Sequence, residues 1–217
     1  DFYLIDELPF IPHIDKKRKL CLFDLEGKII YPEFAGLFKQ CVLKAKELIE
    51  DGISGKNKED FIKEFDSYFA LLSDISIAHV SLPTEKKDTN IKFCEIASKS
   101  KQRKNESFAA YIKRKNDVKY FASTNQKDFD TWAEKGTQKN GIYLYINPLE
   151  YIYPPNIFDY KLDEFLNKLL SFIDFGCFDE LEGKCSNKLI LVFEIKQNDD
   201  TVNTCGFMVE NPKFLVK

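Results

Sequence analysis

Apolar residues recur every three or four positions in two consecutive stretches of the chain, and this spacing predicts two amphipathic helices. The first begins at Pro32, where proline suits a first turn, and ends before Gly52. The second follows a polar link, with Asn57 as its N-cap and Asp60 as an acidic residue in its first turn. The first apolar stripe consists of Phe34, Leu37, Phe38, Cys41, Val42, Ala45, Leu48 and Ile49. The second consists of Phe61, Phe65, Tyr68, Phe69 and Leu72.

Short aromatic and branched runs precede these helices, at residues 2–5 and 19–23, and predict two strands. Pro9, Pro12 and a charged turn at residues 15–19 separate them. The first strand begins at the second residue, with nothing before it to pair with. We therefore expect the sequence to start inside a domain, so that this domain is truncated at its N-terminus.

The second part of the chain is richer in strands. A helix is predicted over residues 160–175, ended by Gly176. The last two strand-like runs flank a polar turn at residues 198–200, which predicts an antiparallel hairpin. The runs are 76–82, 91–96, 120–122, 141–146, 189–195 and 204–209. The predicted fold class is therefore α+β, with one domain over residues 1–74 and a second α+β domain with antiparallel strands over residues 75–217.

The composition is that of a folded domain with a polar surface, since 44% of the 217 residues are hydrophobic and 31% are charged. No apolar run approaches the roughly 20 residues of a membrane-spanning helix, and the N-terminus has no signal-peptide pattern. We expect a cytoplasmic protein that does not enter the membrane. The net charge of −3 gives no general reason to expect nucleic-acid binding. Basic runs at residues 99–104 and 113–115 are more typical of solvated loops, and a phosphate- or nucleic-acid-binding adaptor is a third, weaker hypothesis.

The spacing of cysteine and histidine disfavours a metal site. The six cysteines include no Cys-x-x-Cys pair, and the two histidines, His13 and His79, are far apart in the sequence. His79 lies in an apolar run and is expected to be structural. Cys177 and Cys185 have no histidine nearby and are expected to pack or to lie in a loop. The chain has neither of the glycine-rich motifs Gly-x-Gly-x-x-Gly and Gly-x-x-x-x-Gly-Lys-Ser/Thr, so no nucleotide site and no cofactor are expected.

Cys21 has the greatest chemical interest, and the residues alone leave two interpretations of it open. It stands between Leu20 and Leu22 in an apolar run, which is typical of a buried strand thiol. The cations at residues 16–19 favour a thiolate. The break at Gly27 favours an accessible position, where a strand gives way to a loop.

The wider segment resembles the active-site stretch of ubiquitin-conjugating enzymes. Pro12-His13, a spacer of seven residues, Cys21-Leu22 and then Tyr31-Pro32 precede a long amphipathic helix in that order. The resemblance is closest to prokaryotic ubiquitin-conjugating-like domains that are fused to adenylating (ThiF-like) domains in bacterial antiviral defence operons. Residues 61–69 are similar to the Glu-Phe-x-x-Tyr-Trp ending of that branch, so the resemblance covers roughly residues 8–72.

The resemblance implies a transferase that works through a thioester. Cys21 matches the thioester-forming cysteine, and His13 stands where the eukaryotic enzymes have an Asn that steadies the oxyanion. Ile11 stands where those enzymes have a His. A histidine can donate a hydrogen bond to the oxyanion or accept the proton of the attacking amine, since its reference pKa of about 6.5 lies near neutrality. The chain would then be an acyl carrier that accepts a protein C-terminus on Cys21 and passes it to an amine.

The resemblance also implies partners. They are an adenylating (activating-enzyme) domain and a ubiquitin-like or other tail-bearing protein, such as a cyclic-nucleotide synthase of a defence operon. Residues 75–217 are then expected to form a linker or docking domain. The rival hypothesis is a non-catalytic protein-interaction module, which keeps the conjugating-enzyme-like fold only to bind a partner.

Overall fold

The computed structural model describes residues 2–5, 8–22, 34–72, 77–95, 118–125, 127, 129, 138–159, 161–181 and 187–212. The chain divides into two compact units, each described here by itself. The N-terminal unit consists of Asp1–Leu72 and Tyr151–Phe165, and the sheet unit consists of Ser73–Glu150 and Leu166–Lys217. The N-terminal unit therefore takes in residues 151–165, which the predicted division into 1–74 and 75–217 assigned to the second domain.

The N-terminal segment turns back on itself through the side chain of Asp15. Its carboxylate accepts the backbone N–H groups of Lys17 at 2.7 Å and Lys19 at 2.9 Å, which closes the predicted charged turn. On either side of this turn the chain pairs through single bridges. The described residues therefore form no regular strand at 2–5 and 19–23, where two strands were predicted. The bridges join Tyr3 to Lys19 and Ile14 to Leu20.

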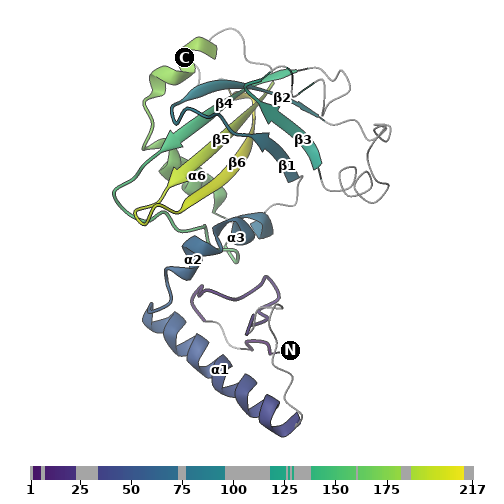
Figure 1. The fold of residues 1–217 in the computed structure, drawn as a ribbon, viewed down its shortest axis with the longest axis vertical. Helices are drawn as coiled ribbons and strands as arrows, with labels where there is room; N and C mark the ends of the chain where they lie inside the picture. Colours follow the sequence, from purple (N-terminus) through teal and green to yellow (C-terminus); the bar gives the residue numbers. More distant parts are fainter. Residues whose placement is uncertain are drawn as a thin grey trace. The chain divides into compact units, whose positions relative to one another are not determined.

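The first helix, α1, spans Phe34–Ser54 and lies beside the N-terminal segment (Figure 1). The predicted start at Pro32 lies outside the described residues. The predicted end before Gly52 is wrong, because the helix continues through this residue. Gly55 ends the helix instead, with a left-handed φ of 76°. Its N–H donates to the carbonyl of Gly52, and the N–H of Lys56 donates to the carbonyl of Asp51, which together form a Schellman motif. Gly52 has a packing role, since a Cβ there would stand 2.7 Å from the Cβ of Ile11.

The apolar stripe of α1 is buried toward the C-terminal end of the helix and exposed toward the N-terminal end. Its buried end packs against the N-terminal hairpin, which is the pair of chain segments joined by the turn at residues 15–19. The buried residues of this contact are Ile11, Ile14, Leu20, Ala45 and Leu48. Nearer the N-terminal end, the exposed fractions are 36% for Leu37, 55% for Phe38 and 41% for Val42. Within the described residues, the hairpin therefore covers only the second half of this stripe.

The predicted second helix is divided in two, α2 at Asp60–Lys63 and α3 at Phe65–Leu72. Glu64 separates them, because its backbone leaves the helical region with φ −100° and ψ 12°. The predicted N-cap at Asn57 is wrong, since Glu59 precedes α2 and no side chain caps the helix. Glu64 therefore lies at the junction of α2 and α3.

The apolar stripe of α2 and α3 packs against residues 151–165. The buried members of this stripe are Phe61, Phe65, Tyr68 and Leu72. Ile157 is buried in the same cluster, and the rings of Phe65 and Phe165 lie 6.2 Å apart between centroids. The division between the two units falls within the next helix, α6, at Leu162–Leu170. A helix ending at Gly176 was predicted here, but α6 ends earlier and Gly176 belongs to the 3₁₀ helix η1, Phe175–Leu181.

The sheet unit contains six strands among the described residues: β1 Ile77–Ser81, β2 Thr89–Glu95, β3 Val118–Ser123, β4 Lys139–Ile146, β5 Lys188–Lys196 and β6 Val202–Glu210. They form one mixed sheet in the order β1-β3-β2-β4-β5-β6 (Figure 1). β1 and β3 pair in parallel, as do β4 and β5. The other neighbours pair antiparallel, including the predicted hairpin of β5 and β6. The α+β class is confirmed, and the two parallel pairs were not predicted.

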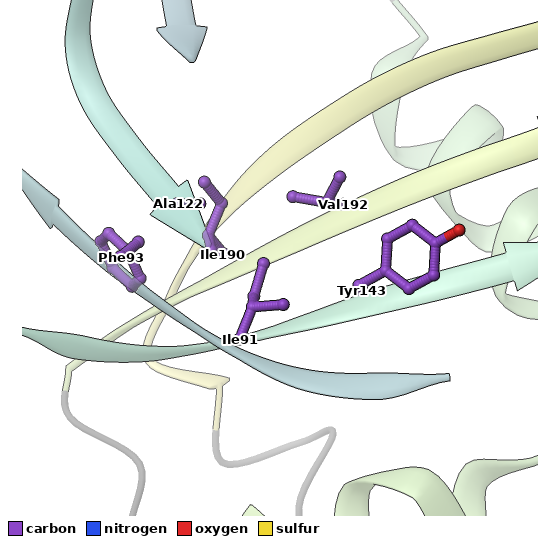
Figure 2. Close-up of a cluster of buried hydrophobic side chains, with 6 residues drawn as sticks. All are labelled: Ile91, Phe93, Ala122, Tyr143, Ile190 and Val192. Carbon is purple, nitrogen blue, oxygen red and sulfur yellow. The ribbon is translucent and has the colours of Figure 1, made fainter. Parts of the chain in front are cut away.

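The central strands bury an apolar cluster on one face of this sheet, shown in Figure 2: Ile91, Phe93, Ala122, Tyr143, Ile190 and Val192. One charged group, Glu194, is buried in the same strands with 1% of its surface exposed. It accepts a hydrogen bond from the Tyr143 hydroxyl at 2.9 Å and pairs with Lys86 at 2.7 Å. Both partners compensate the cost of removing this carboxylate from water.

Replacing Gly52 with alanine is expected to destabilise the N-terminal unit. The new methyl group would lie 2.7–2.9 Å from three atoms of the Ile11 side chain, and overpacking of this kind costs ~1–3 kcal/mol. Gly36, in the same helix, has nothing within 4 Å of the position of a Cβ, so Gly36→Ala should stabilise by up to about 1 kcal/mol through helix propensity. Urea unfolding followed by the helical circular dichroism signal compares the two variants. Equal stability of the two would contradict the close packing of Ile11 on α1.

Candidate active site

His13 and Cys21 lie opposite each other in the N-terminal hairpin. The backbone N–H of Cys21 donates to the carbonyl oxygen of His13 at 2.9 Å. The next pair toward the turn is Ile14 with Leu20, and both of these side chains are buried. Successive residues of an extended chain point to opposite sides, which fits the exposed position of Cys21. The structure thus brings together the two residues predicted to carry chemistry.

The backbone of His13 has a left-handed conformation, with φ 63°. For a residue with a Cβ this costs roughly 1–2 kcal/mol, so other contacts must stabilise it. The Tyr68 hydroxyl of α3 does so, because it accepts the backbone N–H groups of His13 and Ile14. It donates in turn to Glu64. Tyr68 is 3% exposed, and this burial raises the pKa of its hydroxyl, which therefore stays protonated as a donor.

The imidazole ring of His13 lies between two carboxylates. Its Nδ1 is 2.9 Å from Glu64 Oε1, and its Nε2 is 3.2 Å from Asp60 Oδ2. The hydrogen bond with Glu64 is the largest cause of a raised pKa of His13, and burial opposes the rise only in part. At Asp60, burial is outweighed by the hydrogen bonds from Lys63 and His13, so the pKa of this carboxyl is lowered. The ring is therefore favoured as an imidazolium that donates from both nitrogens.

The environment of Cys21 favours its protonated thiol. Although the side chain is exposed, neighbouring protein atoms partly desolvate the sulfur, and this is the main cause of its raised pKa. The charges of Asp15 and Glu64 raise the pKa further, while Lys19 lowers it. The prediction that the cations at residues 16–19 favour a thiolate is therefore wrong in its net effect. The turn that places Lys19 beside the cysteine also places Asp15 there.

Three residues of this site were not predicted as site residues from the sequence. Asp60 was interpreted as a first-turn acid and Tyr68 as part of an apolar stripe, and Glu64 had no role beyond its place in the similar stretch. The signal that could have found the carboxylates is their spacing of four, which places both on one side of a helical turn. The signal for Tyr68 is a tyrosine within a stripe of phenylalanines, since a buried hydroxyl needs a partner.

The other residues considered in the sequence lie in the sheet unit or outside the described residues. His79 is in β1 and Cys177 is in η1. Burial, followed by acidic neighbours, raises the pKa of Cys177 to about 12, which makes it an unreactive thiol. Cys185 and the basic runs at 99–104 and 113–115 are outside the described residues. In the part of the chain that is described, no group of His, Cys, Asp or Glu is placed to hold a metal ion, and no helix has the length and apolar composition of a membrane span.

Residues 3–77 match the family model described as prokaryotic E2 family B, where E2 is the general term for ubiquitin-conjugating enzymes. This segment contains a prokaryotic E2-like domain. It is about a third of the chain and includes His13, Cys21 and all three helices α1, α2 and α3. Searches among curated proteins and among solved structures gave no match. The fusion of this E2-like domain to an adenylating domain, and its place in a defence operon, stay predictions.

Replacing Tyr68 with phenylalanine is expected to destabilise the N-terminal unit by ~1–3 kcal/mol, because it leaves two backbone N–H groups of the turn without their acceptor. The matched control is Tyr3→Phe, since Tyr3 is 53% exposed and its replacement should change stability by less than about 0.5 kcal/mol. Urea unfolding of both variants measures the difference. An equal, small effect of the two substitutions would show that the Tyr68 hydroxyl does not hold the turn.

Proposed function

We propose that this chain is a ubiquitin-conjugating-like acyl carrier of a bacterial conjugation system. Cys21 forms a thioester with the C-terminus of a protein and passes it to an amine, and His13 assists Cys21. The observation that carries the proposal is the exposure of Cys21 beside His13, within the segment that matches the prokaryotic E2 model. Such a position lets a protein partner reach the sulfur while the hairpin holds the backbone.

Both steps of the proposed reaction are exchanges at one carbonyl carbon. In the first, the sulfur of Cys21 attacks the thioester carried by a donor cysteine. The new carbon–sulfur bond forms, the bond to the donor sulfur breaks, and the proton of the Cys21 thiol ends on the donor thiol. In the second, an amine nitrogen attacks the same carbon, the bond to Cys21 breaks, and the proton lost by the amine returns to the Cys21 sulfur.

The raised pKa of Cys21 fits a carrier better than a hydrolase. A thiolate of high pKa is a strong nucleophile once it is formed and a poor leaving group afterwards. The thioester on Cys21 would therefore react slowly with free water and free amines alike, until a partner holds an amine against it. The first step replaces one thioester by another, so it needs little driving force, and ATP is consumed by the activating partner.

The partners proposed are an adenylating (activating-enzyme) domain as donor and a ubiquitin-like or tail-bearing protein as cargo. A cyclic-nucleotide synthase of an antiviral defence operon is one protein with a suitable role. The sheet unit is proposed as the part that docks the activating domain. The reaction is placed in the bacterial cytoplasm, where thiols stay reduced.

A second candidate function is a non-catalytic module that binds a partner protein. The observation that favours it is the exposed apolar surface of α1, at Leu37, Phe38 and Val42. Exposed apolar residues that lie together on one face are typical of protein-binding surfaces. The protonated state of Cys21 is also compatible with a thiol that does no chemistry.

The two functions predict different results in two acyl-transfer assays. The full chain is incubated with a peptide that ends in a glycyl thioester of a small thiol, and the products are mapped by mass spectrometry. We expect an acyl adduct on Cys21 that excess thiol removes, and no such adduct in Cys21→Ala. Cys41→Ala is the matched control, since Cys41 is half-buried on α1 and should not matter. The same comparison is then made with the activating domain, ATP and a tail-bearing protein. If the wild type and Cys21→Ala behave alike in both assays, the chain is not an acyl carrier.

A further inference from the structure

The ring of His13 has no free nitrogen in this structure. Nδ1 lies 2.9 Å from Glu64 and Nε2 lies 3.2 Å from Asp60, so each ring nitrogen faces a carboxylate oxygen. A histidine can accept a proton only through an unprotonated ring nitrogen. While both carboxylates are in place, His13 is therefore unsuited to accept the proton of an attacking amine. The same two contacts occupy both N–H donors of the ring, so neither role considered from the sequence, proton acceptor or donor to the oxyanion, fits this arrangement.

The backbone of His13 connects α2 and α3 to the cysteine. Its N–H donates to the Tyr68 hydroxyl, and its carbonyl accepts the N–H of Cys21 at 2.9 Å. Ring, N–H and carbonyl thus contact three different parts of the N-terminal unit. These contacts link the side-chain position of His13 to the backbone that holds Cys21.

We propose that His13 is a positioning residue, whose ring is held as an imidazolium by Asp60 and Glu64 and whose carbonyl fixes the backbone of Cys21. Asp60 and Glu64 act through His13 and are positioning residues as well. This inference deepens the proposed function and rests on it for its effect on acyl transfer. The state of the His13 ring can be measured without any transfer.

The groups that face His13 give this arrangement a definite pH dependence. They are Asp60, Lys63 and Glu64 in and just after α2, and the Tyr68 hydroxyl of α3. We call the His13 ring with Asp60 and Glu64 the clamp. The pKa of His13 is raised above its ordinary value of 6.5, so the stability that the clamp contributes is complete below pH 6.5. This stability is lost as the pH rises through the raised pKa of His13. The pKa of Asp60 is lowered, so the stability that the Asp60 carboxylate contributes is lost only as the pH falls through this lowered pKa.

The state of the ring is tested by NMR titration of the full chain labelled in histidine. The chain has two histidines, so a His79→Gln variant assigns the His13 signal. We expect His13 to titrate above 6.5, and Glu64→Gln to move its pKa down by more than Asp60→Asn, since Glu64 is the larger cause. Glu59→Gln, an exposed acid next to Asp60, is the matched control and should leave the pKa unchanged. Titration of His13 at its ordinary value, unaffected by Glu64→Gln, overturns the inference.

The positioning role is tested by the rate of acyl transfer from the glycyl thioester peptide to Cys21. The rates of the wild type and of His13→Gln are measured over a range of pH, and their ratio is taken at each pH. The ratio removes the pH dependence that ionisation of the Cys21 thiol gives to both rates. A positioning imidazolium makes this ratio fall as the pH rises through the pKa of His13, whereas a general base makes it rise. Because the charge of Glu64 also raises the pKa of Cys21, the Glu64→Gln rate is compared per ionised thiol. On this basis Glu64→Gln should lower the rate about tenfold to a hundredfold, and adding it to His13→Gln should lower the rate no further.

These outcomes separate the two proposals. If Cys21 accepts no acyl group, the proposed function fails, and the His13 titration still decides whether the clamp exists. If Cys21 accepts the acyl group and the ratio rises with pH, the function stands and the positioning role is overturned. Asp60→Asn is measured in parallel, in case Glu64→Gln fails to fold as judged by circular dichroism. If Asp60→Asn is folded and its His13 pKa has moved, but its rate of acyl transfer is unchanged, the positioning role is also overturned.

Discussion

The buried hydroxyl of Tyr68 is the contact on which the candidate active site depends. It accepts the backbone N–H groups of His13, whose φ is left-handed, and of Ile14, the next residue in the chain. A buried N–H without a partner costs ~1–3 kcal/mol, so a hydroxyl that satisfies two of them contributes more than an ordinary side-chain hydrogen bond. Since α3 supplies this hydroxyl, a residue 55 places later in the chain sets the conformation of the turn.

The acidic groups around the hairpin order its backbone and favour the protonated thiol of Cys21. Asp15 closes the turn and Glu64 holds the His13 ring, and both charges also favour the protonated thiol of Cys21. A protonated thiol is slow to oxidise or to react with small electrophiles, even when it is exposed. On the proposed function, such a cysteine would react mainly when a partner presents a thioester next to it. The carboxylates of Asp15 and Glu64 therefore both stabilise the backbone conformation and lower the reactivity of the Cys21 sulfur.

The elements that follow from local pattern were predicted well, and those that depend on distant contacts were not. The stripe of α2 and α3 and the hairpin of β5 and β6 follow from periodicity and turn residues. Cys21 and His13 were predicted as site residues through the resemblance that their spacing carries, and their catalytic roles stay predictions. Their connection through Tyr68, Asp60 and Glu64 was missed because it requires residues about fifty positions away to meet the hairpin. The helix end was misplaced for a similar reason, since Gly52 serves the packing of Ile11 and Gly55 ends α1.

The return of residues 151–165 to the N-terminal unit has a consequence for biosynthesis. Phe158 meets both Phe10, at 6.0 Å between ring centroids, and the guanidinium of Arg18, at 5.2 Å from the ring centre. Tyr153 lies under Lys58 in the same way, at 4.4 Å. A ribosome that has made the segment matching the E2 model has therefore not yet made all the aromatic side chains that cover it. These apolar surfaces stay without their cover while β1 to β4 are translated, so the N-terminal unit can be completed only after residue 165 has been made, long after its first 72 residues.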